Sequence, residues 1–165
     1  MLSELQKKTP LKEGGYSFVE LLVVSAILMI LASAAMPLTK VVVQRQREVE
    51  LRRSLRDIRV AIDQFKDAAD QGVISAAQLE PGSEGYPPNL ESLVDGLPLA
   101  DDDASGKALR LLRRIPLDPM TKSYEWGLRS YQDRLDSETW GGQNVFDIYT
   151  KSDLMGLDGT RYRDW

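Results

Sequence analysis

The sequence contains neither cysteine nor histidine among its 165 residues. The absence of cysteine excludes disulfides, thiol redox chemistry and cysteine nucleophiles. The absence of both residue types also excludes Ser-His-Asp triads and the usual zinc sites. Any chemistry must therefore use carboxylates, amines, hydroxyls or cations that prefer oxygen ligands. The 21 basic and 25 acidic residues give a net charge of −4, which argues against nucleic acid as a partner.

Charge is missing from one continuous stretch of 19 residues, positions 21–39. At about 1.5 Å per residue a helix of this length measures about 28 Å. That length is close to the roughly 30 Å thickness of the hydrocarbon core of a bilayer. The stretch therefore predicts a helix that crosses a membrane once.

Apolar residues then recur in steps of three and four, a spacing that marks one face of a helix. They are Leu51, Leu55, Ile58, Ile62, Phe65 and Ala69. Pro37 is the only helix breaker between Phe18 and Gln71. We therefore expect one helix over residues 16–71, membrane-spanning in its first half and amphipathic in its second.

The remaining 94 residues, 72–165, mix short apolar segments with turn residues. A short helix is expected between Asn89 and Gly96, and a second one before Pro116. Residues 124–131 and 144–150 are rich in aromatic and β-branched residues and predict two strands. The expected fold is α+β, with the long helix packed on a small C-terminal antiparallel sheet.

A carboxylate at the head of the uncharged stretch is unusual, because a charge deep in a membrane costs about 2.5 kcal/mol or more. The residues that surround it form one short motif. They are Gly15, Tyr16, Ser17, Phe18, Val19 and Glu20. This motif resembles the processing site of type IV prepilins and of the pseudopilins of type II secretion. The resemblance also includes the apolar run and Pro37.

The resemblance implies a pilin-like fold and a defined maturation. Residues 1–15 would be a leader that a prepilin peptidase removes after Gly15, and the new amine of Tyr16 would be methylated. The mature chains would form a homopolymer through their N-terminal helices, in which Glu20 pairs with the amine of a neighbouring Tyr16. An ordinary signal peptide, with a small-residue cleavage site at residues 32–34, and a plain single-span anchor are the alternatives.

The C-terminal stretch, residues 145–165, resembles the end of the G-type major pseudopilin of type II secretion, where an aspartate-containing loop binds calcium. The resemblance places the ligands at Asp153 and Asp158, with Asp147 or Asp164 as further candidates. The loop is shorter than in that family, and the same aspartates are also ordinary turn residues. The segments 87–96 and 115–131 resemble the same family more loosely.

The function implied is that of a structural pseudopilin, not an enzyme, whose periplasmic filament drives protein export. Its partners would be further copies, the prepilin peptidase, minor pseudopilins, the inner-membrane secretion platform and the membrane itself. The chain would cross the bacterial inner membrane once, with residues 72–165 periplasmic. A type IV pilin or minor pilin is the alternative, although the absence of cysteine favours the G-type. A membrane-anchored hydrolase that uses Asp101, Asp102 and Asp103, or a Ser-Lys site, is a further alternative. A solvated turn explains the three aspartates as well.

The flanks of the uncharged stretch differ in charge. Residues 1–15 hold three basic residues, whereas residues 40–59 hold seven basic and three acidic residues, a balance of +4. Cytoplasmic flanks normally carry the excess of basic residues. The basic flank is therefore expected either to meet acidic surfaces of neighbouring subunits or to be a solvated helix face.

Overall fold

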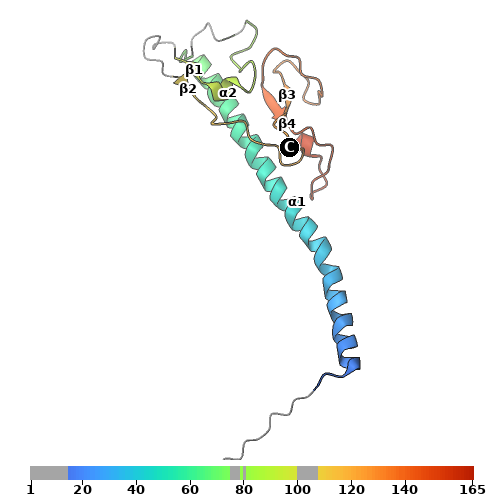
Figure 1. The fold of residues 1–165 in the computed structure, drawn as a ribbon. Helices are drawn as coiled ribbons and strands as arrows, with labels where there is room; N and C mark the ends of the chain where they lie inside the picture. The colour runs from blue at the N-terminus through green and yellow to red at the C-terminus, as the bar shows by residue number, and fades with distance from the viewer. Residues whose placement is uncertain (1–14, 75–78, 80, 100–107) are drawn as a thin grey trace, which may run out of the picture. The chain divides into compact units, whose positions relative to one another are not determined.

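A single long helix dominates the computed structural model, which describes residues 15–74, 79, 81–99 and 108–165, with the backbone alone for 34–38. This helix, α1, spans Phe18–Asp70 and contains 53 residues (Figure 1). It confirms the prediction of one long helix that continues through Pro37. The chain divides into two compact units, Met1–Lys40 and Val41–Trp165, and the boundary lies within α1.

In the first unit, α1 exposes its apolar side chains. Leu21, Leu28 and Ile30 are more than half exposed. Within the part of the chain that the structure describes, no helix combines the length and the apolar character needed to cross a membrane. The membrane span predicted for residues 21–39 therefore stays a prediction.

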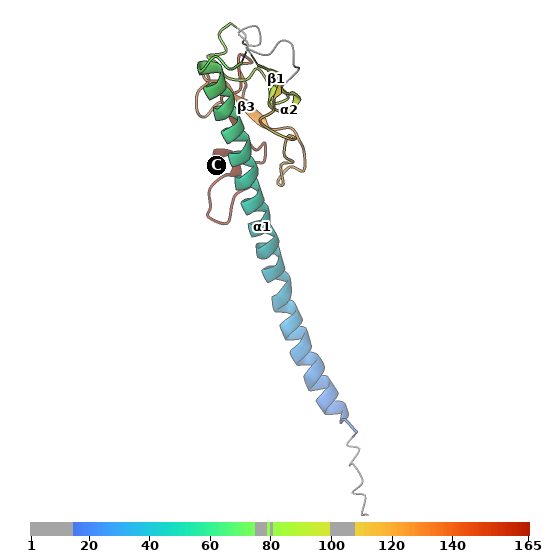
Figure 2. The same ribbon diagram turned by 90° about the vertical axis from the view of Figure 1, so that its left-hand side faces the viewer.

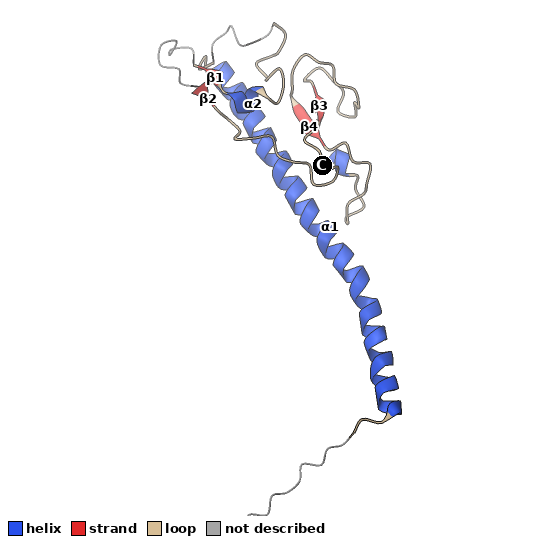
Figure 3. Cartoon of the chain, viewed as in Figure 1, coloured by secondary structure: helices blue, strands red, loops and turns tan. Residues whose placement is uncertain are grey.

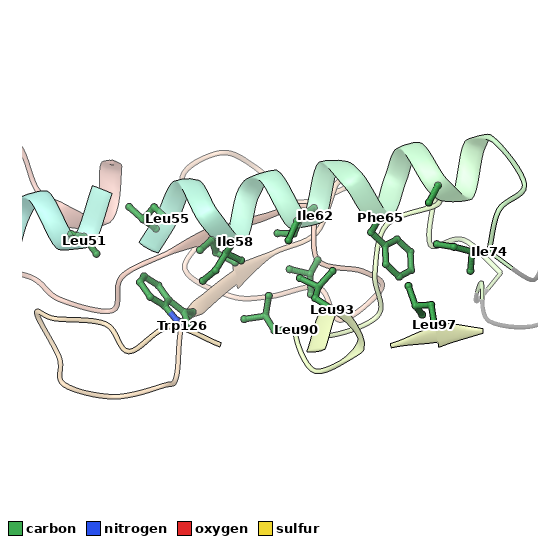
Figure 4. Close-up of a cluster of buried hydrophobic side chains, with 14 of the residues drawn as sticks. Leu51, Leu55, Ile58, Ile62, Phe65, Ile74, Leu90, Leu93, Leu97 and Trp126 are labelled. Atoms are coloured by element: carbon green, nitrogen blue, oxygen red, sulfur yellow. The ribbon is translucent and has the colours of Figure 1, made fainter. Parts of the chain in front are cut away.

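In the second unit, the apolar stripe of α1 forms one side of the core (Figure 4). Leu51, Ile58, Ile62 and Phe65 are completely buried. They pack in one cluster with side chains from the rest of the unit: Ile74, Leu90, Leu93, Leu97, Trp126, Val145 and Ile148. The spacing in the sequence thus predicted the buried face correctly.

Short elements make up the rest of the second unit (Figure 3). Helix α2 spans Ser92–Asp95, and the 3-10 helix η2 spans Tyr162–Asp164. Strand β1, Leu97–Pro98, pairs antiparallel with β2, Ala108–Leu109. Strand β3, Gly127–Arg129, pairs antiparallel with β4, Asp147–Tyr149. The α+β class is therefore confirmed, and the described residues form two small two-stranded sheets in place of one.

Three local predictions are confirmed. Both predicted strands contain a strand, β3 and β4. The Asn89 side chain accepts a hydrogen bond from the Ser92 amide at 2.9 Å, at the start of α2. Gly96, with φ at +91°, follows the end of this helix.

The second short helix, predicted before Pro116, is wrong over the described residues 108–116. Residues 108 and 109 form β2, and no regular element follows before Pro116. The amides of Leu111 and Leu112 instead donate to the carbonyl of Leu93, at 3.1 and 2.8 Å. Their side chains pack against the core in this irregular, non-helical conformation. Tertiary contacts therefore override the local helical preference.

Strands β3 and β4 depend on one glycine. In their register Gly127 faces Tyr149. A Cβ atom at position 127 would lie 2.3 Å from the Tyr149 ring. Only glycine leaves room for this ring. The Arg129 guanidinium also lies against the ring, 4.3 Å from its centroid.

Candidate functional site

The motif at the start of the first unit is accessible. Gly15, Tyr16 and Ser17 precede α1 without regular secondary structure and are exposed. The Leu21 amide donates to the Ser17 carbonyl at 3.1 Å, which begins the hydrogen bonding of the helix. A peptidase needs a reachable backbone, and the exposed Gly15–Tyr16 bond meets this condition.

Glu20 lies in the first turn of α1 and is exposed. A negative charge at this position is favoured by the unpaired amides of the helix N-terminus. Among the described residues it has no ion-pair or hydrogen-bond partner, so its carboxylate is available to a group from outside the chain. Residues 1–14, which hold the rest of the predicted leader, lie outside the described residues.

In the second unit, a buried carboxylate anchors the C-terminal loop to α1. The Glu48 side chain accepts hydrogen bonds from the Tyr162 hydroxyl at 2.9 Å and from the Leu157 amide at 2.8 Å. The Gln44 side chain donates to the Tyr162 hydroxyl at 2.9 Å and to the Met155 carbonyl at 3.3 Å. Burial raises the pKa of the Tyr162 hydroxyl. These contacts fix where residues 154–157 lie.

The sequence analysis did not identify Glu48 as a buried hydrogen-bonding residue, although its spacing in the sequence indicates this. Gln44 and Glu48 continue the spacing of the apolar stripe toward the N-terminus, in steps of four and three to Leu51. Polar residues at positions of a buried stripe indicate a hydrogen-bonded network.

The predicted calcium ligands each contact an arginine. The Asp158 carboxylate accepts from the amide and hydroxyl of Thr160, at 3.0 and 2.6 Å, and from Arg52 at 3.2 Å. These hydrogen bonds and the Arg52 charge hold the pKa of the Asp158 carboxyl below its usual range. Asp153 forms an ion pair with Arg163, which also contacts Glu138.

The two further candidates differ from each other. Asp147, on β4, accepts a hydrogen bond from Arg59 of α1 at 2.7 Å, and Arg129 lies 3.7 Å from its other oxygen. Asp164 lies on η2 and is exposed. Arg59 also donates to the main-chain oxygen of Trp165 at 2.7 Å, which places the last residues of the chain beside α1 (Figure 2).

The arrangement presents no metal site in this conformation. Over the described parts of the chain, no group of three or more acidic side chains is placed to hold a metal ion. Asp153 and Asp158 would both have to leave their arginines before they could share a cation. Asp101, Asp102 and Asp103 lie outside the described residues.

A second buried carboxylate was also missed. Asp118 is completely buried and accepts hydrogen bonds from the Met120 amide and from the hydroxyls of Thr121 and Thr150. It ties the turn at residues 118–123 to the end of β4. An aspartate between two prolines is a signal for such a turn, but its partner Thr150, 32 residues away, is not visible in the sequence.

Residues 11–36 match the family described as Prokaryotic N-terminal methylation motif. No curated protein and no solved structure matches the chain. The matched segment contains the Gly15–Tyr16 bond and Glu20, and this motif is the type IV pilin-like prepilin signal. It indicates a type IV pilin-like protein, either a pilin or a pseudopilin. A signal of this kind implies a membrane anchor and suggests methylation, processing by a prepilin peptidase and polymerisation.

Proposed function

We propose that the protein is a structural pseudopilin of a type II secretion system, whose periplasmic filament drives protein export. The N-terminal methylation motif at residues 11–36 carries the proposal, because a prepilin signal of this kind supports processing and assembly. The absence of cysteine supports a pseudopilin, since many type IV pilins carry a C-terminal disulfide loop. The loose resemblance of the C-terminal segments to the G-type supports the same choice.

Assembly is proposed to use the exposed apolar surface of the first unit. After cleavage, Tyr16 would carry a positive amine, and Glu20 has no described partner of its own. A carboxylate and an amine that pair between neighbouring chains offset the cost of burying both in an apolar bundle. Before assembly, residues 21–39 would hold the chain in the inner membrane, with residues 72–165 in the periplasm. Minor pseudopilins and the inner-membrane secretion platform would be further partners.

The mass of the N-terminal peptide of the protein isolated from its host tests this proposal. We expect a methylated peptide that begins at Tyr16. A peptide that begins at Ala35 would identify an ordinary signal peptide and refute the proposal. Deletion of the gene then separates the two filament types: a pseudopilin is needed for export of folded proteins, whereas a type IV pilin is needed for long surface fibres.

Calcium binding by Asp153 and Asp158 stays a prediction. The arginines that hold these carboxylates compete with a cation, and the described conformation gives no complete ligand set. Calcium prefers six to eight oxygen ligands, so main-chain carbonyls of the loop would have to supply most of them.

A further inference from the structure

Charged and aromatic side chains line a groove in the second unit, between α1 and the segment that precedes β3. The groove has a volume of about 720 Å³. Arg53 belongs to its α1 side, and Arg113, Arg114, Leu117 and Tyr124 belong to the other side. Leu117 and Tyr124 are 41% and 64% exposed. Interfaces between proteins are enriched in arginine and tyrosine, so the groove has the composition of a docking site.

Two arginines of the groove have no counter-charge in the described parts of the chain. Arg113 and Arg114 are exposed, and neither forms an ion pair with a described residue. Arg53 lies 3.8 Å from Asp57, one turn further along α1. Glu50 also lines the groove. With three basic and two acidic side chains, the groove keeps a positive excess that a partner can neutralise.

Further along α1, one exposed face carries unpaired negative charge. Asp63 and Asp67 are exposed and lie one turn apart, and neither forms an ion pair or a hydrogen bond with a described residue. The nearby Lys66 is engaged by Asp70. Like charges four positions apart destabilise a helix, so this pair gains nothing from its own chain. Gln64 lies on the same exposed face, at about 100° per residue.

The two charged surfaces lie at different levels of the same helix. Asp63 and Asp67 follow Arg53 by 10 and 14 residues, which a helix covers in about 15 and 21 Å. Two parallel copies displaced by this distance along α1 bring the acidic face of one beside the groove of the other. Parallel copies in register would instead place acids level with acids and arginines level with arginines. Opposite charges therefore favour the displaced arrangement.

We propose that the groove binds the acidic face of α1 from a second copy, with Arg113 and Arg114 against Asp63 and Asp67. Each copy then keeps one free groove and one free acidic face, so the contact repeats without closing and builds a filament. The inference rests on the proposed function, because copies anchored in one membrane with the same topology are parallel. It adds the surfaces that meet and the displacement between the copies.

The absence of cysteine permits a cross-linking test on the full chain in membranes of its host. Gln64→Cys places a thiol on the acidic face and Leu117→Cys places one in the groove, so every charge is retained. The two variants carry different tags and are produced together in a strain that lacks the unmodified chain. A third chain carries both cysteines. Leu135→Cys, at a site that is 86% exposed, controls for chance collisions.

After oxidation we expect the mixed product of positions 64 and 117 to exceed the products that join two identical positions. The chain with both cysteines should give a ladder of multimers, and Leu135→Cys should give only a background of dimers. Reversing the basic pair, as Arg113→Glu with Arg114→Glu, should lower the mixed product by roughly fivefold or more, because attraction between exposed charges becomes repulsion. Reversing the acidic pair, as Asp63→Lys with Asp67→Lys, should lower it equally.

Two controls separate a lost contact from a damaged fold. All four reversals in one chain should restore the mixed product, because the charges are again opposite. The matched control is Arg134→Glu with Arg161→Glu, which changes the net charge equally at exposed sites outside the groove and should keep the mixed product. Salt at 1 M should weaken the contact of the unmodified pairs, since the Debye length falls to about 3 Å.

Four results would overturn the inference. Products that join identical positions at the level of the mixed product indicate a contact without the expected polarity. A chain with both cysteines that stops at dimers indicates a closed antiparallel pair. A mixed product that ignores all four charge reversals removes the role of these residues. Filaments of chains that begin at a methylated Tyr16, without any mixed product, leave the proposed function intact and remove only this contact. Chains that are not processed at Tyr16 refute the proposed function itself.

Discussion

Helix α1 carries two apolar surfaces, one exposed in the first unit and one buried in the second. In the first unit Ile30 is 69% exposed, whereas in the second unit Ile58 of the same helix is completely buried. The residue type and the backbone conformation are the same, so the difference comes from what the rest of the chain covers. The second unit covers the apolar stripe of α1 with its own residues. The first unit leaves an apolar surface that something outside the chain must cover, as expected of a chain with a prepilin signal.

The largest effect is expected when residues 1–15 are never removed from the first unit. A prepilin peptidase must accommodate the residue before the cleaved bond, and glycine offers no side chain. We expect Gly15→Leu to retain residues 1–15 and to block filament formation. The mass of the protein from the host measures this directly. Normal maturation of the variant would contradict the assignment of the motif.

Glu20 tests whether the first unit needs a charge as well as an apolar surface. We expect Glu20→Ala to be inserted and cleaved but to enter filaments poorly or not at all, because the amine of Tyr16 loses its partner. Glu20→Gln keeps the shape and removes only the charge, so it should fail in the same way. Sedimentation of sheared filaments measures the assembled fraction. Filaments at the level of the unmodified chain would refute the pairing.

Truncating one apolar side chain in each unit tests the difference between the buried and the exposed surface of α1. Phe65→Ala removes a completely buried ring and should cost about 3–5 kcal/mol in the free energy of unfolding of the second unit. Leu28→Ala, on the exposed surface of the first unit, should change the same free energy by less than about 0.5 kcal/mol. Urea unfolding in detergent, followed by tryptophan fluorescence, compares them. Equal losses would mean that the two units are not separate in stability.

Melting with and without calcium tests whether the second unit is stabilised entirely by its own residues. If Asp153 and Asp158 bind the ion, folding gains about 2.7 kcal/mol at a hundredfold excess over Kd. The full chain in detergent should then melt at a higher temperature with calcium than with chelator. Asp153→Ala and Asp158→Ala should abolish the difference, and Asp136→Ala, an exposed acid elsewhere, should keep it. An unchanged melting temperature would leave both aspartates as partners of Arg163 and Arg52.

A smaller loss than that of Phe65→Ala is expected for the packing of β3 against β4. Gly127→Ala places a methyl group against the Tyr149 ring and should destabilise the second unit by about 1–3 kcal/mol. Combining it with Tyr149→Leu should recover part of the loss, because the smaller side chain makes room. The same urea unfolding measures both variants. A neutral Gly127→Ala would show that the ring can move away without cost.

The sequence alone determined the features that depend on neighbours along the chain. The length of α1 follows from the scarcity of helix breakers, and its buried face follows from the three- and four-residue spacing that ends at Phe65. The prepilin signal is likewise local, because a peptidase reads a short segment. The positions of β3 and β4 could be predicted because aromatic and β-branched residues favour strands before any partner is known.

Only the tertiary structure decided which residues of the second unit, far apart in the sequence, contact each other. Leu111 and Leu112 are not helical, because the Leu93 carbonyl accepts hydrogen bonds from their amides. Asp158 points to Arg52, which is 106 residues away, and Glu48 to Tyr162, which is 114 residues away. Contacts over such separations depend on how the whole core packs. Local secondary-structure propensity does not predict them. The candidate metal ligands could therefore be named from the sequence, while their arginine partners could be found only in the fold.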